Sequence, residues 1–252
     1  MTEFLSPAPP RVLAHRGLAV HAPENSMLAF MHALDAGATF LETDVHATAD
    51  GVAVVAHDPS LDRVAGRDIR IEQTLWQDLA EIDLGEGERV PALRDVLLAL
   101  PDAKWNIDLK ADAAVVPTVR AVVEAKATQR VLLTSFSERR RRQAQALLPG
   151  VATSASQAIV VRALAAQRLG MHGLLQRVLE PVVALQVPRR AKGIEVITER
   201  SVAAFRRAGV EVHVWTINEP AEMRELLELG VDGIVTDRYD LALPVVEGFA
   251  RP

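Results

Sequence analysis

Short runs rich in β-branched residues alternate with apolar stretches at helical spacing along most of this 252-residue chain. Eight of the runs are candidate strands, at residues 12–14, 39–45, 104–109, 131–134, 151–154, 182–187, 211–216 and 233–236. Most are followed by a candidate helix, such as those at residues 26–36, 113–126, 138–147, 159–169, 199–208 and 220–229. Alternation of strand and helix predicts a parallel sheet, and eight units closing on themselves predict an α/β fold of the (β/α)₈ TIM-barrel type.

The connection between the second and third predicted strands is too long for a simple helix. It runs from residue 51 to residue 100 and holds an extra candidate strand, 52–56, and two helical patterns, 74–82 and 92–100. We interpret it as a small inserted subdomain folded over the barrel mouth, so that residues 1–252 form a single barrel domain. The main alternative is a doubly wound open sheet, but its usual glycine-rich phosphate loop is missing after the first strand.

Charge and cysteine content limit the possible function classes. The net charge is −5 at pH 7, and no basic block is long enough to track a nucleic-acid backbone, so nucleic acid is not an expected partner. An anionic small molecule would need local positive charge, from a metal ion or from a few placed cations. The chain has no cysteine, which excludes disulfides, thiol catalysis and cysteine-ligated zinc and fits a reducing compartment.

The first ten residues lack the basic and apolar regions of a secretion signal. No segment approaches the roughly 18 apolar residues that a membrane-spanning helix needs. We therefore expect a cytoplasmic protein without stable membrane insertion. The sequence contains no coiled-coil heptads and does not define an oligomeric state.

Acidic residues collect near the ends of the second and third predicted strands, where barrel enzymes carry their catalytic groups. Alternation of side chains puts Glu42 and Asp44 on one face of the second strand, and Asp108 lies on the polar face of the third. Three inward carboxylates on adjacent strands repel one another, and Ca²⁺ or Mg²⁺ with oxygen ligands would relieve this repulsion. The alternative is that these acids are solvated and balanced by Arg16 and Lys110.

Two of the seven histidines stand out by position. His15 lies where the first strand ends, and His57 closes the extra strand, so both are expected near one mouth of the barrel. Histidine exchanges protons near neutral pH, which makes the pair candidates for acid–base catalysis. We interpret the remaining histidines as surface, helix or packing residues: His21, His32, His46, His172 and His213.

Trp215 ends the seventh predicted strand and alternates with Val212 and Val214. It faces the barrel lumen if the two valines face the helices. There it is either a core residue or an apolar wall for a glycerol-sized group.

The order and spacing of several motifs resemble the glycerophosphodiester phosphodiesterase family. The matching segments, from about residue 11 to residue 240, are Ala14-His-Arg-Gly17, Ala22-Pro-Glu-Asn-Ser26, Leu41-Glu-Thr-Asp-Val45, Asp50-Gly51, Val54-Val-Ala-His-Asp58, Leu61-Asp-Arg63, Pro91-Ala-Leu-Arg-Asp-Val96, Asn106-Ile-Asp-Leu-Lys110, Val214-Trp-Thr-Ile-Asn218 and Asp232-Gly-Ile-Val-Thr-Asp237. The resemblance implies a (β/α)₈ barrel with an insertion after the second strand. It also implies hydrolysis of glycerophosphodiesters to glycerol 3-phosphate and an alcohol.

The resemblance also implies a role for each candidate residue. The general acid and base would be His15 and His57, and the ligands of one divalent cation, Ca²⁺ or Mg²⁺, would be Glu42, Asp44 and Asp108. The phosphate-binding cations would be Arg16 and Lys110, and the apolar lid would be Trp215. The third metal ligand is commonly Glu in the family, so Asp108 changes the reach of that ligand.

Headgroup contacts are expected from the insertion and from Gln186, Arg189 and Arg190. The alternatives are a lysophospholipase D-like or sphingomyelinase D-like enzyme and a catalytically silent, ligand-binding relative. The complete set of histidines and acids argues against a silent relative.

Overall fold

The computed structural model describes residues 3–191 and 193–249 of the chain. Its main sheet contains eight parallel strands: β1 (Arg11–His15), β2 (Phe40–Ala47), β6 (Lys104–Leu109), β7 (Val131–Thr134), β8 (Ala152–Thr153), β9 (Ala184–Pro188), β12 (Glu211–Trp215) and β13 (Gly233–Thr236). They follow the order β8-β7-β6-β2-β1-β13-β12-β9, and a parallel bridge between Ser154 and Ala184 joins the two ends of this row. The predicted TIM barrel is confirmed, and the eight predicted strands coincide with the observed ones to within two residues at each end.

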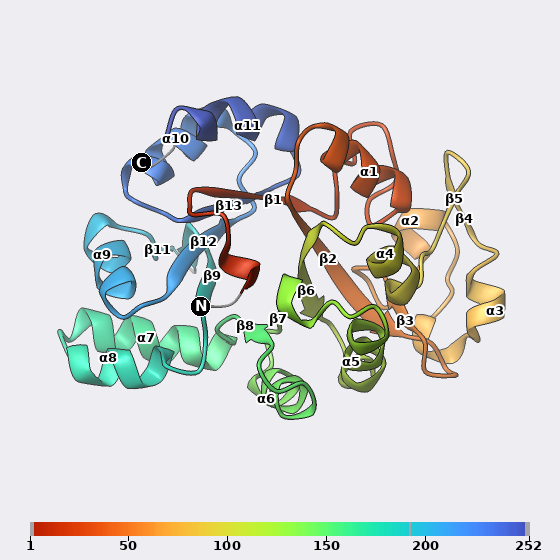
Figure 1. Cartoon of the computed structure of the whole chain (residues 1–252), viewed down its shortest axis with the longest axis horizontal. Helices are drawn as coiled ribbons and strands as arrows, with labels where there is room; N and C mark the ends of the chain where they lie inside the picture. Colours follow the sequence, from red (N-terminus) through yellow and green to blue (C-terminus); the bar gives the residue numbers. More distant parts are fainter. Residues whose placement is uncertain (1–2, 192, 250–252) are drawn as a thin grey trace.

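Helices cover the outside of the barrel (Figure 1). They are α1 (Met27–Asp35), α4 (Leu93–Ala99), α5 (Val115–Glu124), α6 (Glu138–Leu147), α7 (Gln157–Arg168), α8 (His172–Leu179), α9 (Glu199–Arg207), α10 (Pro220–Glu228) and α11 (Tyr239–Glu247). The predicted helices are present, but α8 and α11 were not expected, and α11 contains a proline at position 244. In the described ranges, no helix is long and apolar enough to cross a bilayer.

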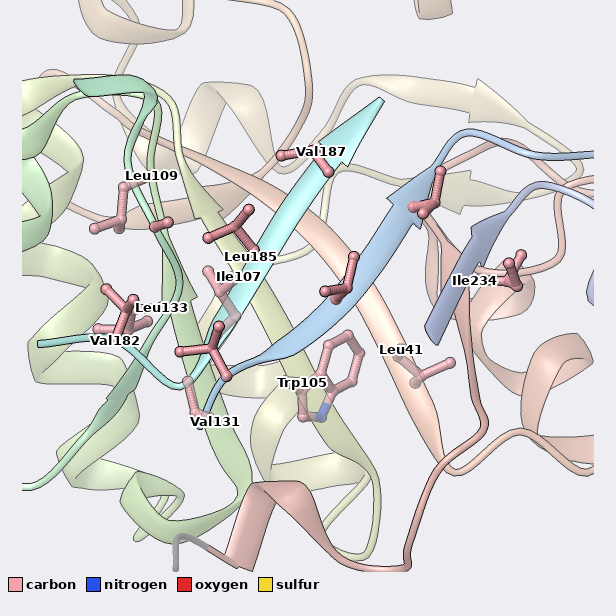
Figure 2. Close-up of a cluster of buried hydrophobic side chains, with 14 of the residues drawn as sticks. Leu41, Trp105, Ile107, Leu109, Val131, Leu133, Val182, Leu185, Val187 and Ile234 are labelled. Atoms are coloured by element: carbon pink, nitrogen blue, oxygen red, sulfur yellow. The ribbon is translucent and has the colours of Figure 1, made fainter. Parts of the chain in front are cut away.

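Alternation along β6 shows how the sheet divides its side chains between two layers. Trp105, Ile107 and Leu109 are buried in the apolar layer between sheet and helices, as Figure 2 shows. Asn106 and Asp108, the residues between them, point to the other side of the strand. The predicted polar inner face of this strand is therefore confirmed.

The connection between β2 and β6 contains several short elements with an apolar core of their own. β3 (Ala53–Val55) pairs antiparallel with β2, and it is followed by α2 (Asp62–Ala65), α3 (Trp76–Leu79), β4 (Asp83–Gly85) and β5 (Glu88–Arg89). The helix expected over residues 74–82 is thus reduced to the single turn of α3. The core of this segment contains Val54, Ala56, Leu61, Ile71, Leu79, Ile82 and Val90.

The amino-terminal segment closes the floor of the barrel, the end at which the strands begin. A short 3₁₀ helix, η1 (Glu3–Leu5), lies beside the barrel axis in Figure 1. Its Phe4 is fully buried and packs edge-on against Phe40, with ring centroids 5.5 Å apart. Arg11 and Lys104, the first residues of β1 and β6, donate hydrogen bonds to backbone carbonyls of this segment. The segment therefore completes the interior core from below.

Gly17 allows α1 to pack directly against the loop that follows His15. Its φ is +84°, and an added Cβ would lie 2.6 Å from the carbonyl carbon of Ala29 in α1. Gly51 also has a positive φ, +80°, but an added Cβ there would meet no atom within 4 Å. An alanine at position 17 would therefore suffer both backbone strain and steric overlap, whereas an alanine at position 51 would suffer backbone strain alone.

We predict that Gly17→Ala lowers the free energy of unfolding by about 3 kcal/mol or more. A positive φ costs an alanine about 1–2 kcal/mol, and overpacking adds about 1–3 kcal/mol. Gly51→Ala is the matched control and should cost only the first of these amounts. Chemical denaturation of both variants measures the difference, and equal losses would show that α1 moves away at no cost.

Candidate active site

Three carboxylates lie together at the mouth, the end where the parallel strands finish, because the strands that carry them are in register. Asp44 of β2 is paired with Asp108 of β6, and Glu42 of β2 is paired with His15 of β1. The three acids are at most 6% exposed. The structure therefore brings together the acids that the sequence singled out.

Two cations lie among these acids. Lys110 Nζ is 2.8 Å from both Asp44 Oδ1 and Asp108 Oδ2. Arg16 Nε is 3.1 Å from Asp44 Oδ2, although its N–H does not point along a hydrogen bond. As the side chains of the described ranges lie, no group of three or more His, Asp or Glu is spaced to hold a metal ion, and Lys110 lies between two of the acids.

Burial, the neighbouring carboxylates and the two cations together shift the pKa values of the three acids in different directions. Burial, and after it the charge of Asp44, raises the pKa of Glu42 to about 8. Burial also raises the pKa of Asp108, against the opposing effect of Lys110. Burial acts upward on Asp44 too, but the charges of Lys110 and Arg16 outweigh it and lower the pKa of Asp44. The three carboxylates at the mouth would therefore carry more negative charge, if all were ionised, than Lys110 and Arg16 neutralise.

His15 is held by a carboxylate that directly follows the last strand of the barrel. Its Nδ1 lies 2.6 Å from Asp237 Oδ1, while its Nε2 lies 3.9 Å from Glu42 Oε2. Asn218 holds Asp237 in turn, donating to Asp237 Oδ2 at 2.8 Å. Burial alone would lower the pKa of His15, but the charge of Glu42 and the hydrogen bond to Asp237 together raise it.

His57 follows β3 and is held by its neighbour in the chain. Its Nδ1 lies 2.8 Å from Asp58 Oδ1, and Arg63 Nε of α2 donates to the other oxygen of Asp58 at 2.6 Å. The backbone carbonyl of His57 accepts a hydrogen bond from His46 Nε2 at 3.1 Å. His46, expected to be an ordinary packing residue, therefore supports the segment that carries His57.

An open cleft of about 390 Å³ adjoins these residues, a size that suits a small molecule. It is lined by His46, Ala47, His57, Asp58, Pro59, Glu72, Lys110, Ala111 and Ala113. His57 and Lys110 thus belong both to this cleft and to the charged mouth.

Trp215 faces the barrel interior, as the alternation along β12 predicted. It packs against the interior apolar cluster, while Val212 and Val214 are buried on the helix side of the sheet. Phe136, in the loop after β7, contacts Trp215 edge-on with ring centroids 6.1 Å apart and is 56% exposed. The sequence did not identify Phe136, because a single aromatic residue in a loop carries no periodic signal.

The residues expected to contact a headgroup are engaged elsewhere. Gln186 donates to Asn106 at 2.9 Å and to His213 Nδ1 at 3.3 Å, within the barrel. Arg189 forms ion pairs with glutamates at positions 195, 222 and 225, and Arg190 also pairs with the first of these. These side chains therefore bind other parts of the chain.

The comparisons with known proteins agree with this geometry. The sequence model of the Glycerophosphoryl diester phosphodiesterase family matches residues 15–241. A relative from Mycobacterium tuberculosis, named probable glycerophosphodiester phosphodiesterase 2, is 43% identical over 97% of this chain and 93% of its own length.

Two solved structures share the fold. The crystal structure of glycerophosphodiester phosphodiesterase from Agrobacterium tumefaciens has a TM-score of 0.76 at 28% identity, with 93% of this chain and 98% of that chain covered. An Oleispira antarctica phosphodiesterase, solved in complex with the product sn-glycerol-3-phosphate, has a TM-score of 0.77 at 23% identity, with 94% and 96% covered. With a family match over nearly its whole length, this chain belongs to the glycerophosphoryl diester phosphodiesterase family of phosphoric diester hydrolases.

Proposed function

We propose that the chain hydrolyses glycerophosphodiesters to glycerol 3-phosphate and an alcohol, with His15 and His57 as the general acid and base. The observation that carries this proposal is the pair of histidines at one charged mouth, with Nδ1 atoms 2.6 Å and 2.8 Å from carboxylate oxygens. An imidazole that donates from Nδ1 to a carboxylate keeps Nε2 for proton exchange. The product bound by the Oleispira antarctica phosphodiesterase supports glycerol 3-phosphate as a product.

The two histidines divide the proton transfers between them. One takes the proton from the attacking oxygen, and the other gives a proton to the leaving alkoxide. Each such transfer typically contributes about 10²–10⁴-fold to the rate. The attacking oxygen belongs either to the glycerol itself, forming a cyclic phosphate that water then opens, or to water directly. Both routes use the same pair of side chains.

The phosphate and the glycerol need separate contacts at the mouth. Arg16 and Lys110 are the cations available to the nonbridging phosphate oxygens, Arg16 through its planar fork and Lys110 as a point charge. Trp215 offers an apolar wall for the glycerol carbons. This division leaves the cleft beside His57 and Lys110 for the headgroup, where it is bordered by residues of the insertion.

We further propose that Glu42, Asp44 and Asp108 hold one divalent cation, Ca²⁺ or Mg²⁺, once the Lys110 ammonium, which lies 2.8 Å from both aspartates, turns toward the phosphate. Oxygen donors suit these hard ions, and Asp108 Oδ1 is buried with no hydrogen-bond partner in the described part of the chain. The raised pKa of Glu42 is a second sign of missing positive charge. A bound cation would neutralise the phosphate charge that repels a nucleophile.

The rest of the proposal concerns the whole chain. We propose that residues 1–252 act as one barrel domain, in which the insertion at residues 51–100 supplies His57. The cytoplasmic location and the absence of a nucleic-acid partner stay predictions of the sequence.

We predict that His15→Ala and His57→Ala each lower turnover of glycerophosphodiesters by about 10²–10⁴-fold, because each removes one proton transfer. The assay follows release of glycerol 3-phosphate from choline, ethanolamine and inositol substrates, with and without added Ca²⁺ or Mg²⁺. His172→Ala, an exposed histidine of α8, is the matched control and should retain full activity. Full activity of either site variant would refute the assignment of its histidine.

We predict that the cation-free protein loses stability as pH rises from about 5 to about 8. The folded-state pKa of Glu42, about 8, lies above its ordinary value of 4.5, so the contribution of the protonated form is present at low pH and is lost through this window. Glu42→Gln removes the titration and should flatten the profile of unfolding free energy against pH. Added Ca²⁺ or Mg²⁺ should stabilise the natural chain at pH 8 more than this variant. Parallel profiles for the two proteins would contradict the prediction.

A further inference from the structure

A row of alternating charges joins the acidic cluster to His57. It begins at Asp44, passes through Arg16 to Glu24, and continues through Arg63 to Asp58, whose carboxylate holds the imidazole of His57. Neighbouring charges of the row form ion pairs with shortest distances of 3.1 Å or less, and Asp58 Oδ1 lies 2.8 Å from His57 Nδ1. Its members come from three segments: the mouth of the barrel, the loop before α1 and the insertion.

The link between Glu24 and Arg63 is the part that crosses from barrel to insertion. Arg63 Nη1 and Nη2 donate to the two oxygens of Glu24 at 2.9 Å and 2.7 Å, which is the bidentate arrangement of a guanidinium and a carboxylate. Arg63 Nε is used at the same time for Asp58, so one guanidinium aligns both acids. Glu24 also accepts from Arg16 Nη1 at 3.0 Å. Every charge in this link has an opposite neighbour on each side.

Glu24 and Asp58, the two acids that Arg63 contacts, both ionise more readily than usual. Burial works against this for Glu24, but the hydrogen bond from Arg63 and the charge of Arg16 lower its pKa. The hydrogen bonds from His57 and Arg63 likewise outweigh burial and lower the pKa of Asp58. The row therefore keeps its charges near neutral pH.

His57 needs such support because little else fixes its ring. Its side chain is 33% exposed, and it sits on an insertion whose apolar core is separate from the barrel core. Asp58 is 30% exposed and Arg63 is 49% exposed, so either pair alone would be a weak surface ion pair. A bidentate contact to the less exposed Glu24 restricts the guanidinium and, through it, the carboxylate that orients His57.

We propose that Glu24 and Arg63 are positioning residues that hold Asp58, and thereby keep the proton of the His57 imidazole on Nδ1 and its Nε2 free for the reaction. This inference rests on the proposed function, since it assigns the pair to the orientation of one of the two acid–base groups. Neither residue of the pair is among those that line the cleft assigned to the headgroup. Its effect should therefore appear in turnover and not in substrate affinity.

The kinetic test compares Arg63→Met, Arg63→Lys, Glu24→Gln and the double variant Glu24→Gln/Arg63→Met on a glycerophosphodiester. Arg63→Met should lower kcat by about tenfold or more with KM unchanged within about twofold, because small misplacements of a catalytic group can cost on the order of 10²-fold. Arg63→Lys should recover part of the loss, since an ammonium restores the charge but not the fork. The double variant should be no slower than Arg63→Met, because both changes act through Asp58.

The control is Arg94→Met, which breaks an ion pair of 2.8 Å with Glu124 between α4 and α5 and should leave kcat and KM unchanged. Thermal unfolding of each variant shows whether a loss of turnover reflects loss of the folded state. A rise in KM at constant kcat would overturn the proposal, because it would mean that Arg63 contacts the substrate. Additive losses in the double variant would also overturn it.

A second measurement does not depend on turnover. Nitrogen-15 NMR of the imidazoles distinguishes the Nδ1–H and Nε2–H tautomers of His57. We expect mainly Nδ1–H in the natural chain and in Arg94→Met, and a mixture in Arg63→Met. An unchanged His57 spectrum in Arg63→Met would overturn the positioning role. If the natural chain cleaved no glycerophosphodiester while the spectra changed as expected, the proposed function would fail and the positioning role would stand.

Discussion

Repulsion between three buried carboxylates is the constraint on which the mouth of this barrel depends. Strand register places Glu42, Asp44 and Asp108 next to one another, and water cannot screen them there. Lys110 and Arg16 offset part of the charge, and a raised pKa on Glu42 absorbs another part. The same imbalance would favour the proposed divalent ion and, together with it, an anionic phosphodiester.

The two histidines obtain their orientation in different ways. His15 sits on a strand, and its partner Asp237 follows a neighbouring strand, so the closed sheet itself fixes the pair. His57 lies in a loop beyond a three-residue strand, and its partner is the next residue in the chain. Secondary structure does little to hold His57 and Asp58, so contacts between charged side chains orient them instead.

Local sequence patterns predicted most of the barrel, but they did not predict contacts between side chains that lie far apart in the sequence. The alternation of Trp105, Ile107 and Leu109 with polar residues identifies both faces of β6 from a few neighbouring positions. Nothing near His15 in the sequence indicates Asp237, which lies 222 positions away and meets it only when the barrel closes. The motif segments contain Glu24 and Arg63, but their pairing depends on how the insertion folds back. Local periodicity also missed two helices, α8 and α11. In α11 the reason is a proline, which normally argues against a helix.

The apolar core of the insertion links the proposed chemistry to the packing of a second part of the chain. A molecule in which the insertion had not packed would still carry His15, the three acids and both cations, but it would lack the support that the insertion gives to His57. Before His57, Ala53 and Val55 pack into the barrel core, whereas Val54 and Ala56 belong to the smaller core of the insertion. The position of His57 therefore depends on both cores, so the proposed acid–base pair is sensitive to the packing of the barrel and of the insertion together.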